Sequence, residues 1–289
     1  MTRLRSATAA LAAAALMAAS CGGHGDARDD ASTSPTEGGG WWRPDADVTW
    51  QWQLAAGADA SAPINTSYDV DVYDVDLADT STGQIERLHG AGRRVVCYFS
   101  AGSAEAWRDD ADRFTDDDLG AGLEGWPGER WLDVRSANVR AIMGDRLDLA
   151  AEKGCDGVEP DNTDGFSNDT GLDVGRADTL AYLRWLADQA HGRGLGIGLK
   201  NTLGLVDELA DTFDFAVNEQ CHDFDECDAL QPFRARSKPV LNAEYVEPNT
   251  AAAAEAARAR VCAQATAAGT TTLILPLELD DSFRVACVP

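Results

Sequence analysis

Short apolar runs recur along the chain and alternate with segments of helical periodicity. The clearest run is 94–100, which is apolar almost without interruption, as is typical of a parallel strand buried on both faces. In 48–54 tryptophan and glutamine alternate, so the two side-chain types point to opposite faces of a strand. Strands are predicted for eight segments: 48–54, 68–76, 94–100, 157–161, 195–201, 213–219, 239–245 and 271–276.

Helical patterns, most of them closed by glycine, fill most gaps between these strands. Helices are predicted at 82–92, 138–153, 179–193, 206–211 and 250–268. The segments 101–136 and 221–237 lack such a pattern and are predicted mostly as loops. Eight strands with intervening helices is the count of an α/β protein built as a single (β/α)8 TIM barrel.

Polar residues gather at the C-terminal ends of the predicted strands, the end that carries the chemistry in such a barrel. Asp161 and Glu219 each close a buried strand, and a pair of carboxyl groups is the minimal equipment for cleaving a glycosidic bond. We therefore predict these two acids as the catalytic residues. Further candidates at or near the same ends, expected to bind substrate, are Gln51, Asp74, Tyr98, Asn162, Lys200, Asn201, Glu244 and Tyr245.

The first 40 residues differ from the rest in composition. Residues 1–21 have a positive start and an alanine-rich apolar run too short to span a bilayer, the pattern of a signal peptide. The small residues before Cys21 resemble a bacterial lipobox, which predicts lipidation of Cys21; plain secretion is the alternative, because Ala18 stands where leucine is usual. Residues 22–40 are predicted as a flexible linker, which leaves 41–289 as the barrel domain.

Charge and cysteine content narrow the class of partner. The formal net charge of −25 argues against a nucleic-acid partner, which requires a basic surface, and would attract a cationic substrate. Seven cysteines leave six for pairing if Cys21 carries lipid, as expected in an oxidising compartment. We predict a monomer without cofactor or metal that meets the membrane only through its lipid, on the extracellular face of a bacterium.

Cysteine spacing suggests pairings but does not fix them. Cys221 and Cys227 are close enough to staple one loop, and Cys262 and Cys287 could tie the last helix to the C-terminal tail. The other two, Cys97 and Cys155, either pair or remain buried thiols. A zinc site at Cys221, His222 and Cys227 lacks a second close pair of ligands.

Several segments of this chain resemble glycoside hydrolase family 114, the endo-α-1,4-polygalactosaminidases. The most specific are Glu-Pro-Asp-Asn at 159–162 and Asn-Glu-Gln-Cys at 218–221. Supporting segments are 50–54, 95–103, 131–135, 199–201 and 241–245. The resemblance implies a barrel that cleaves internal α-1,4 linkages of galactosamine-containing polysaccharide, with its two essential acids at Asp161 and Glu219.

As a mechanism we expect Asp161 to be the nucleophile and Glu219 the general acid/base; the reverse order stays open. Lys200 would hold the nucleophile ionised, whereas the acid needs a raised pKa. Glu159 shares a face with Asp161 but lies two residues deeper. The two carboxyl groups lie about 5–5.5 Å apart in retaining enzymes and about 6.5–9.5 Å apart in inverting ones, and only the family resemblance favours retention.

Other interpretations remain. The domain could be a sugar-binding barrel without catalysis, which would require aromatic and amide side chains rather than two facing acids. A metal-dependent hydrolase would use Asp69, Asp71 and Asp74, but only the first two share a strand face and no histidine is near. Tyr98 and Tyr245 could stack on sugar rings or pack in the core.

Overall fold

A computed structural model describes residues 40–55 and 64–287 of the chain. The predicted signal segment 1–21, the lipidation site Cys21 and residues 22–39 of the predicted linker lie outside the described residues. In the described part, no helix is long and apolar enough to cross a membrane.

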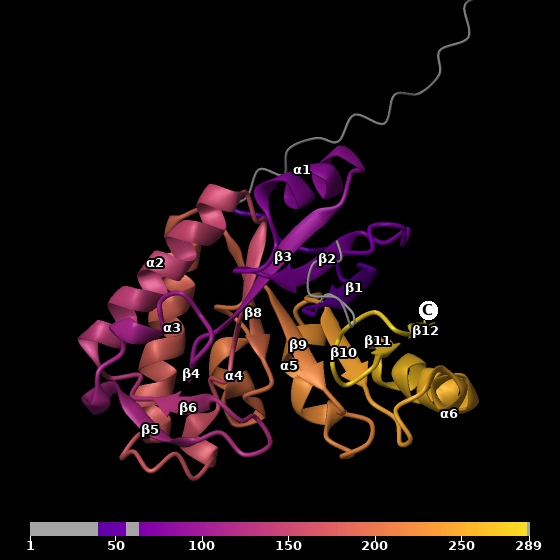
Figure 1. The fold of residues 1–289 in the computed structure, drawn as a ribbon. Coiled ribbons are helices and arrows are strands. Elements are labelled where there is room, and N and C mark those ends of the chain that lie inside the picture. Colours follow the sequence, from indigo (N-terminus) through magenta and orange to yellow (C-terminus); the bar gives the residue numbers. More distant parts are fainter. Residues whose placement is uncertain (1–39, 56–63, 288–289) are drawn as a thin grey trace, which may run out of the picture. The chain divides into compact units, whose positions relative to one another are not determined.

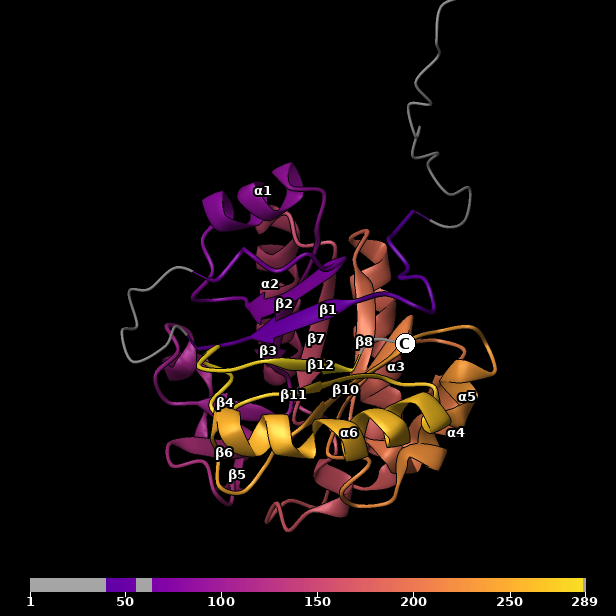
Figure 2. The same cartoon turned by 90° about the vertical axis from the view of Figure 1, so that its right-hand side faces the viewer.

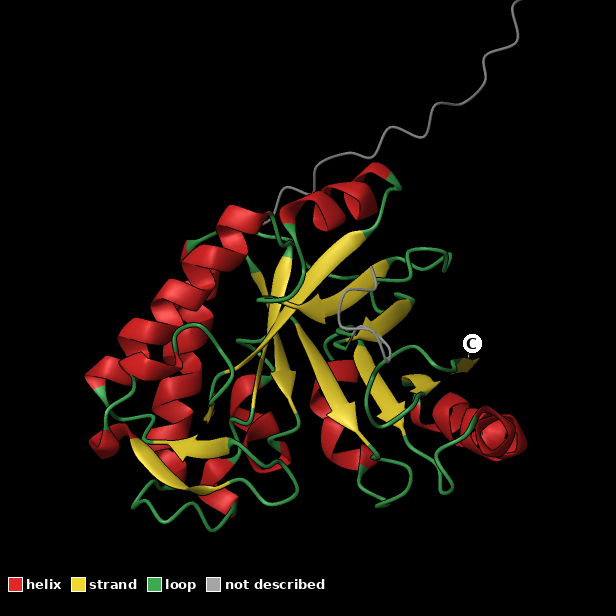
Figure 3. Cartoon of the chain, viewed as in Figure 1, coloured by secondary structure: helices red, strands yellow, loops and turns green. Residues whose placement is uncertain are grey.

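A nine-stranded curled sheet forms the framework (Figures 1 and 3). Its order is β1-β2-β3-β7-β8-β9-β10-β11-β12; the first eight strands are parallel and β12 is antiparallel to β11. All eight predicted strands are present. The bounds are β1 Trp50–Gln53, β2 Val72–Asp76, β3 Arg94–Ser100, β7 Gly157–Asp161, β8 Gly196–Lys200, β9 Phe215–Glu219, β10 Val240–Glu244, β11 Thr271–Ile274 and β12 Val285–Cys287.

The two ends of this sheet approach each other without pairing in a ladder within 40–55 and 64–287. Trp50 on β1 donates its indole N–H to the carbonyl of Thr271 on β11 at 3.1 Å, and Arg284 donates to the Trp50 carbonyl at 2.8 Å. The α/β class and the mostly parallel sheet are confirmed, whereas closure into an eight-stranded barrel stays a prediction.

Helices cover the outer face of the sheet. α1 packs on β3, α2 on β7, α3 on β8, and α6 on β11 and β12, which Figure 2 shows from the side of α6. The helices begin and end where local chemistry allows: Ser136 caps the first turn of α2, and Gly154 ends it in a left-handed conformation. The bounds are α1 Thr82–Gly90, α2 Ala137–Lys153, α3 Arg176–Gly192, α4 Val206–Leu209, α5 Gln231–Arg234 and α6 Ala251–Ala268.

The inner face of the sheet changes from apolar to charged along the strands. On β9, Phe215 and Val217 pack in an apolar cluster with the tryptophans of β1, and Glu219 follows them on the same face. Gly198 on β8 leaves room for Phe215, because a Cβ there would lie 2.4 Å from the ring. Lys200 follows Gly198 on that face. Apolar packing at one end of the sheet thus supports charged side chains at the other.

The prediction of a long loop over 101–136 is wrong. This segment holds a second, three-stranded sheet of β4 Ser103–Glu105, β5 Leu119–Gly122 and β6 Glu129–Leu132, seen at the lower left of Figure 1. Its strands are only three or four residues long, too short to show a clear apolar alternation, and β5 has glycine at two of its four positions. The predicted loop 221–237 contains a 3-10 helix, Cys227–Leu230, and α5.

Three disulfides join the six cysteines of the described part. Cys97–Cys155 ties β3 to the start of β7, Cys221–Cys227 closes the loop after β9, and Cys262–Cys287 ties α6 to β12. Both pairings suggested by spacing are confirmed, and the third pair is bonded rather than free.

Candidate active site

One lysine ammonium joins the two predicted catalytic acids. Lys200, at the end of β8, places Nζ 2.9 Å from Asp161 Oδ2 and 3.2 Å from Glu219 Oε2. These acids end β7 and β9, the strands on either side of β8. Nζ also lies 3.3 Å from Glu159 Oε1, deeper on β7. The lysine is 2% exposed, so its charge is balanced by these carboxylates rather than by water.

The chain leaves all three of these strands through residues with positive φ. Asn162, Asn201 and Gln220 have φ of 58°, 47° and 58°. This left-handed conformation disfavours most side chains, and asparagine tolerates it best after glycine. The turns carry strain at the rim of the sheet, where such strain commonly marks a functional site.

The asparagines at these exits hold the site in place. Asn201 donates to Glu219 Oε2 at 3.1 Å and accepts from the Glu219 backbone N–H at 3.0 Å. Asn162 donates its backbone N–H to Asp161 Oδ1 at 2.6 Å, while its side chain donates to the Ser100 hydroxyl at 3.0 Å. Asn201 therefore fixes one acid through its side chain, and Asn162 fixes the other through its backbone.

Gly102 lies directly against the end of β7. Its backbone N–H donates to the carbonyl of Asp161 at 3.0 Å, and a Cβ at this position would lie 1.7 Å from the carbonyl oxygen of Asn162. Only glycine permits this contact without moving the backbone that carries Asp161.

Glu219 is held as an anion. The Tyr245 hydroxyl donates to Glu219 Oε1 at 2.5 Å, and Asn201 and Lys200 contact the other oxygen. Burial acts to raise the pKa of Glu219, but the Lys200 charge and these hydrogen bonds outweigh it, so the pKa lies below its ordinary value. A catalytic acid was expected to have a raised pKa. Burial acts to lower the pKa of Lys200, yet Asp161 and Glu219 hold it well above the usual range.

Beneath Lys200 lies a second carboxyl pair, Asp74 and Glu159. Both side chains are fully buried, and Glu159 Oε1 lies 3.3 Å from Lys200 Nζ. Burial raises the pKa of Asp74 to about 7, against the opposing effects of its hydrogen bond with Glu159 and of Lys200. Burial and the Asp74 charge raise the pKa of Glu159 well above its usual range. Two adjacent buried carboxyls are stable only when they share a proton.

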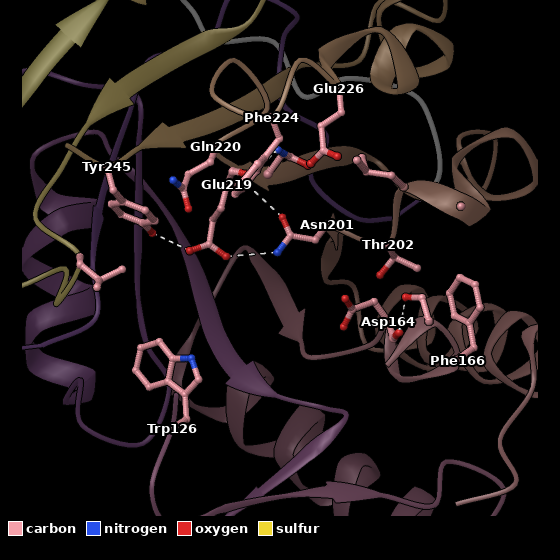
Figure 4. A pocket seen from close by; sticks show the side chains of 15 residues that line it. Trp126, Asp164, Phe166, Asn201, Thr202, Glu219, Gln220, Phe224, Glu226 and Tyr245 are labelled. Atoms are coloured by element: carbon pink, nitrogen blue, oxygen red, sulfur yellow. Dashed lines mark hydrogen bonds between the residues drawn. The ribbon is translucent and has the colours of Figure 1, made fainter. Parts of the chain in front are cut away.

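A cavity of about 550 Å³ opens beside Glu219 (Figure 4). Glu219, Asn201 and Tyr245 line it; Asp161 is not among the lining residues, and its side chain is 16% exposed against 28% for Glu219. The remaining lining residues are Trp126, Asp164, Phe166, Ser167, Thr202, Leu203, Gly204, Asn218, Gln220, Phe224, Glu226 and Leu277.

Other predicted substrate-binding residues lie away from the cavity. Gln51 is fully buried and donates to Asp281 at 3.1 Å. Glu244 is buried and accepts from the backbone N–H of His222 at 3.0 Å, so it anchors the loop after β9. Tyr98 places its ring 5.9 Å from Lys200 Nζ. The substrate contacts predicted for these side chains, and for the buried Asp74, stay predictions.

The predicted metal alternatives have little support in this geometry. Asp69 pairs with Arg93 at 2.6 Å, and Asp71 accepts from the Thr49 hydroxyl at 2.6 Å, whereas Asp74 faces the interior. Among the described residues, the three His, Cys, Asp or Glu side chains close enough to hold an ion are Cys221, His222 and Cys227. Both cysteines are in a disulfide, which removes the thiolates a zinc site needs.

Several cavity residues escaped the sequence interpretation. Asp164 follows Asp161 by three residues, and burial together with the Asp161 charge raises its pKa. Trp126 and Phe224 lie in segments predicted as loops, where no strand pattern fixes a direction for the side chain. The available signal was a large aromatic residue in a polar segment, which is unusual because such side chains are mostly buried.

Comparison with known proteins identifies the family. Glycoside-hydrolase family GH114 matches residues 31–288. Ega3 of Aspergillus fumigatus, solved as a complex with galactosamine, shares 42% identity and a TM-score of 0.77, covering 85% of this chain and 97% of Ega3. The glycoside hydrolase domain of PelA from Pseudomonas aeruginosa shares the fold at 17% identity and a TM-score of 0.67, covering 82% of this chain and 98% of that domain.

No curated protein matches the chain. The family match spans all of the described residues and confirms the resemblance inferred from the strand-end motifs. The 42% identity to Ega3 is high enough to indicate a common family, and the match covers 97% of Ega3. The chain belongs to glycoside-hydrolase family GH114 and is a glycoside hydrolase.

Proposed function

We propose that this enzyme cleaves internal α-1,4 linkages of a galactosamine-containing polysaccharide, with Asp161 as nucleophile and Glu219 as general acid/base on a closed (β/α)8 barrel. The observation that carries the proposal is the shared Lys200 ammonium. Asp161 Oδ2 and Glu219 Oε2 both contact Lys200 Nζ, so these two oxygens lie at most about 6 Å apart. This distance supports the short carboxyl separation of a retaining enzyme.

In this mechanism Asp161 bonds to the anomeric carbon while Glu219 gives its proton to the departing glycosidic oxygen. Glu219, now a carboxylate, then takes a proton from water, whose oxygen displaces Asp161 from the same carbon. The sugar is released with its original anomeric configuration. Lys200 and the Asn162 N–H position and stabilise the nucleophile, and Tyr245 and Asn201 orient the acid.

The lowered pKa of Glu219 gives this mechanism a defined pH requirement. A proton donor works only in its protonated form, so activity must fall as pH rises through the pKa of Glu219. The proposed enzyme therefore works best in acid. In the reverse order of roles, Glu219 is the nucleophile and its lowered pKa is favourable at neutral pH.

A cationic amino sugar suits the charge of the cavity. Asp164, Glu219 and Glu226 line it, and the whole chain carries a net charge of −25. Ega3, to which the chain is 42% identical, binds galactosamine in its crystal. These observations support a partly or fully deacetylated polymer as substrate.

We place the enzyme outside the cell, held to a bacterial membrane by lipid on Cys21. Three disulfides suit an oxidising compartment, and the first 21 residues have the pattern of an export signal. Metabolic labelling with a fatty-acid analogue tests the anchor, and Cys21→Ser removes the label if the lipid is attached there.

Hydrolysis is tested on partly deacetylated α-1,4-galactosaminoglycan with the parent enzyme, Asp161→Asn and Glu219→Gln. The matched control is Glu255→Gln, an exposed acid of α6 that pairs with Arg258 and does not line the cavity. We expect reducing ends from the parent and the control and at least a 10²-fold loss in the two variants. Equal release by all four proteins rejects the pair. Binding of the polymer without release of ends by the parent favours the alternative, a sugar-binding barrel.

The order of roles is tested by azide rescue with a galactosaminyl fluoride. If Asp161 is the nucleophile, Asp161→Ala with azide gives a glycosyl azide of inverted configuration. Azide then takes the place of the missing carboxylate and displaces fluoride from the anomeric carbon in a single step. Glu219→Ala with azide then gives the retained product. The opposite pair of products assigns the nucleophile to Glu219.

A further inference from the structure

Water-exposed large apolar side chains are concentrated at the cavity. In residues 40–55 and 64–287 they are Trp107, Trp126, Leu149, Phe224 and Leu277, with exposed fractions of 56%, 53%, 37%, 62% and 50%. Trp126, Phe224 and Leu277 all line the cavity beside Glu219. Exposed apolar surface gathered around a cleft generally marks a binding site.

The two aromatic residues come from loops on opposite sides of the catalytic strands. Trp126 lies between β5 and β6, in the segment that follows β3, and Phe224 lies in the loop that follows β9. In the sheet order β3-β7-β8-β9, these loops flank the strand ends that carry Asp161, Lys200 and Glu219. Figure 4 shows Glu219 between Trp126 and Phe224.

Local structure holds both aromatic residues in place. Trp126 donates its backbone N–H to Leu123 at 3.2 Å and accepts from Glu129 at 3.1 Å. Phe224 donates its N–H to the carbonyl of Gln220 at 3.0 Å, in the loop closed by the Cys221–Cys227 disulfide. Because the backbone is already ordered, ligand binding immobilises little more than side chains, which lowers its entropic cost.

The chemistry of the lining defines the ligand. Aromatic rings offer flat apolar faces, which match the C–H face of a pyranose ring. Asp164, Glu219 and Glu226 add negative charge, and no lysine, arginine or histidine is among the described lining residues. The matching ligand has apolar ring faces and positive charge, which describes a chain of amino sugars, whose ammonium groups also favour aromatic faces.

We propose that Trp126 and Phe224 are stacking platforms for two sugar rings, one on each side of the linkage that Glu219 protonates. This inference rests on the proposed function and deepens it: a chain gripped on both sides of the cleaved bond is cut internally rather than trimmed from an end. Leu277 adds a third exposed apolar side chain to the cavity lining.

The test compares Trp126→Ala with Trp107→Ala. Both tryptophans belong to the segment of the three-stranded sheet and are about equally exposed, but only Trp126 lines the cavity. Each change is made in the enzyme and in its Glu219→Gln form, and binding of α-1,4-galactosamine oligomers to the latter is measured by calorimetry. We expect Trp126→Ala to weaken binding about tenfold and to raise KM more than it lowers kcat.

Trp107→Ala is expected to bind as the parent does, and Trp126→Phe to recover most of the affinity because it keeps an aromatic face. Phe224→Ala is expected to weaken the binding of long oligomers more than that of short ones. It is also expected to shift the cleavage products toward longer fragments. Melting temperatures of all variants show whether any loss comes from unfolding.

The outcomes separate this inference from the proposed function. If the parent cleaves the polymer while Trp126→Ala binds and cleaves like Trp107→Ala, the proposed stacking role is refuted. The proposed hydrolysis then still stands. If the parent does not cleave but Glu219→Gln binds oligomers through Trp126, the platforms stand and hydrolysis is refuted. Absence of both cleavage and binding overturns both.

Discussion

Glu219 and Lys200 form an ion pair with 3.2 Å between Oε2 and Nζ, inside a site where the lysine is 2% exposed. The pair opposes the effect of burial and holds the pKa of Glu219 below its ordinary value. Because so little water screens the pair, its effect on Glu219 is larger than that of a surface ion pair.

Removing the lysine charge should therefore shift the pH dependence. In Lys200→Met the pKa of Glu219 rises, so a Glu219 acid stays protonated to higher pH and the basic limb of kcat/KM moves upward. The change also leaves buried carboxylates without a counter-ion, at a cost of about 3–5 kcal/mol in the free energy of unfolding. Profiles of kcat/KM from pH 3 to 9 measure the limb.

Lys153→Met is the control, because Lys153 at the end of α2 donates to the carbonyls of Leu77 and Thr80 in the turn after β2 and forms no ion pair with either catalytic acid. It is expected to lower stability without moving the limb. A basic limb unchanged in Lys200→Met would contradict Glu219 as the proton donor.

Gly102→Ala should disable the site without touching a charged group. The added methyl group would overlap the Asn162 carbonyl, so the backbone that carries Asp161 must shift. A displacement near 1 Å can cost about 10²-fold in rate, which kcat/KM measures. Gly90→Ala at the end of α1, where a Cβ meets nothing within 4 Å, is the control and should be neutral or stabilising by up to about 1 kcal/mol. Full activity in Gly102→Ala would mean that the strand end tolerates the shift.

The buried Asp74 should make stability fall as pH rises. Its folded pKa is about 7 against an ordinary 3.8, so between these values the unfolded chain releases a proton that the folded chain keeps. Stability from this group is present below the ordinary pKa and is lost as pH rises through the folded one, by about 1 kcal/mol per pH unit. Glu159 acts in the same direction.

Asp74→Asn removes one titrating group while its amide can still donate to Glu159. Urea denaturation at pH 4, 5.5 and 7 should show a shallower decline of the free energy of unfolding in the variant than in the parent. Parallel curves would show that the carboxyl pair does not hold its proton over this range.

The disulfides should differ in their contribution to stability. Cys97–Cys155 spans 58 residues and Cys221–Cys227 spans 6. By loop-closure entropy, replacing the first pair with serine should cost about 4 kcal/mol and the second about 2 kcal/mol. Urea unfolding of the two double variants checks the order. A larger loss from the short loop would point to contacts of that loop, not chain entropy, as the source of its stability.

The strand framework could be read from the sequence because each parallel strand is a local apolar run. Glu159 and Asp161 alternate with apolar or small residues, so their shared face and their depth followed from period-two geometry. The position of Lys200 between two acids followed from strand order, once consecutive strands were assumed to be neighbours.

The remainder depends on distant parts of the chain. The sheet β4-β6-β5 is stabilised by pairing between short strands, such as Ser103 with Trp131. No local sequence pattern predicts this pairing. The raised pKa values of Asp74 and Glu159 depend on two residues that are 85 positions apart, on strands separated by β3. The lowered pKa of Glu219 depends first on the Lys200 charge and then on the hydroxyl of Tyr245, whose direction a sequence does not give.

The left-handed exits after β7, β8 and β9 also limit how this enzyme can evolve. At Asn162, Asn201 and Gln220 a β-branched substitution would meet a steric penalty regardless of its chemistry. In a saturation library, these three positions should therefore tolerate few residues, chiefly glycine, asparagine and aspartate. The surrounding loops should tolerate many more substitutions. New substrate preferences will arise by changing those outer loops, while the three exits keep the acids in register.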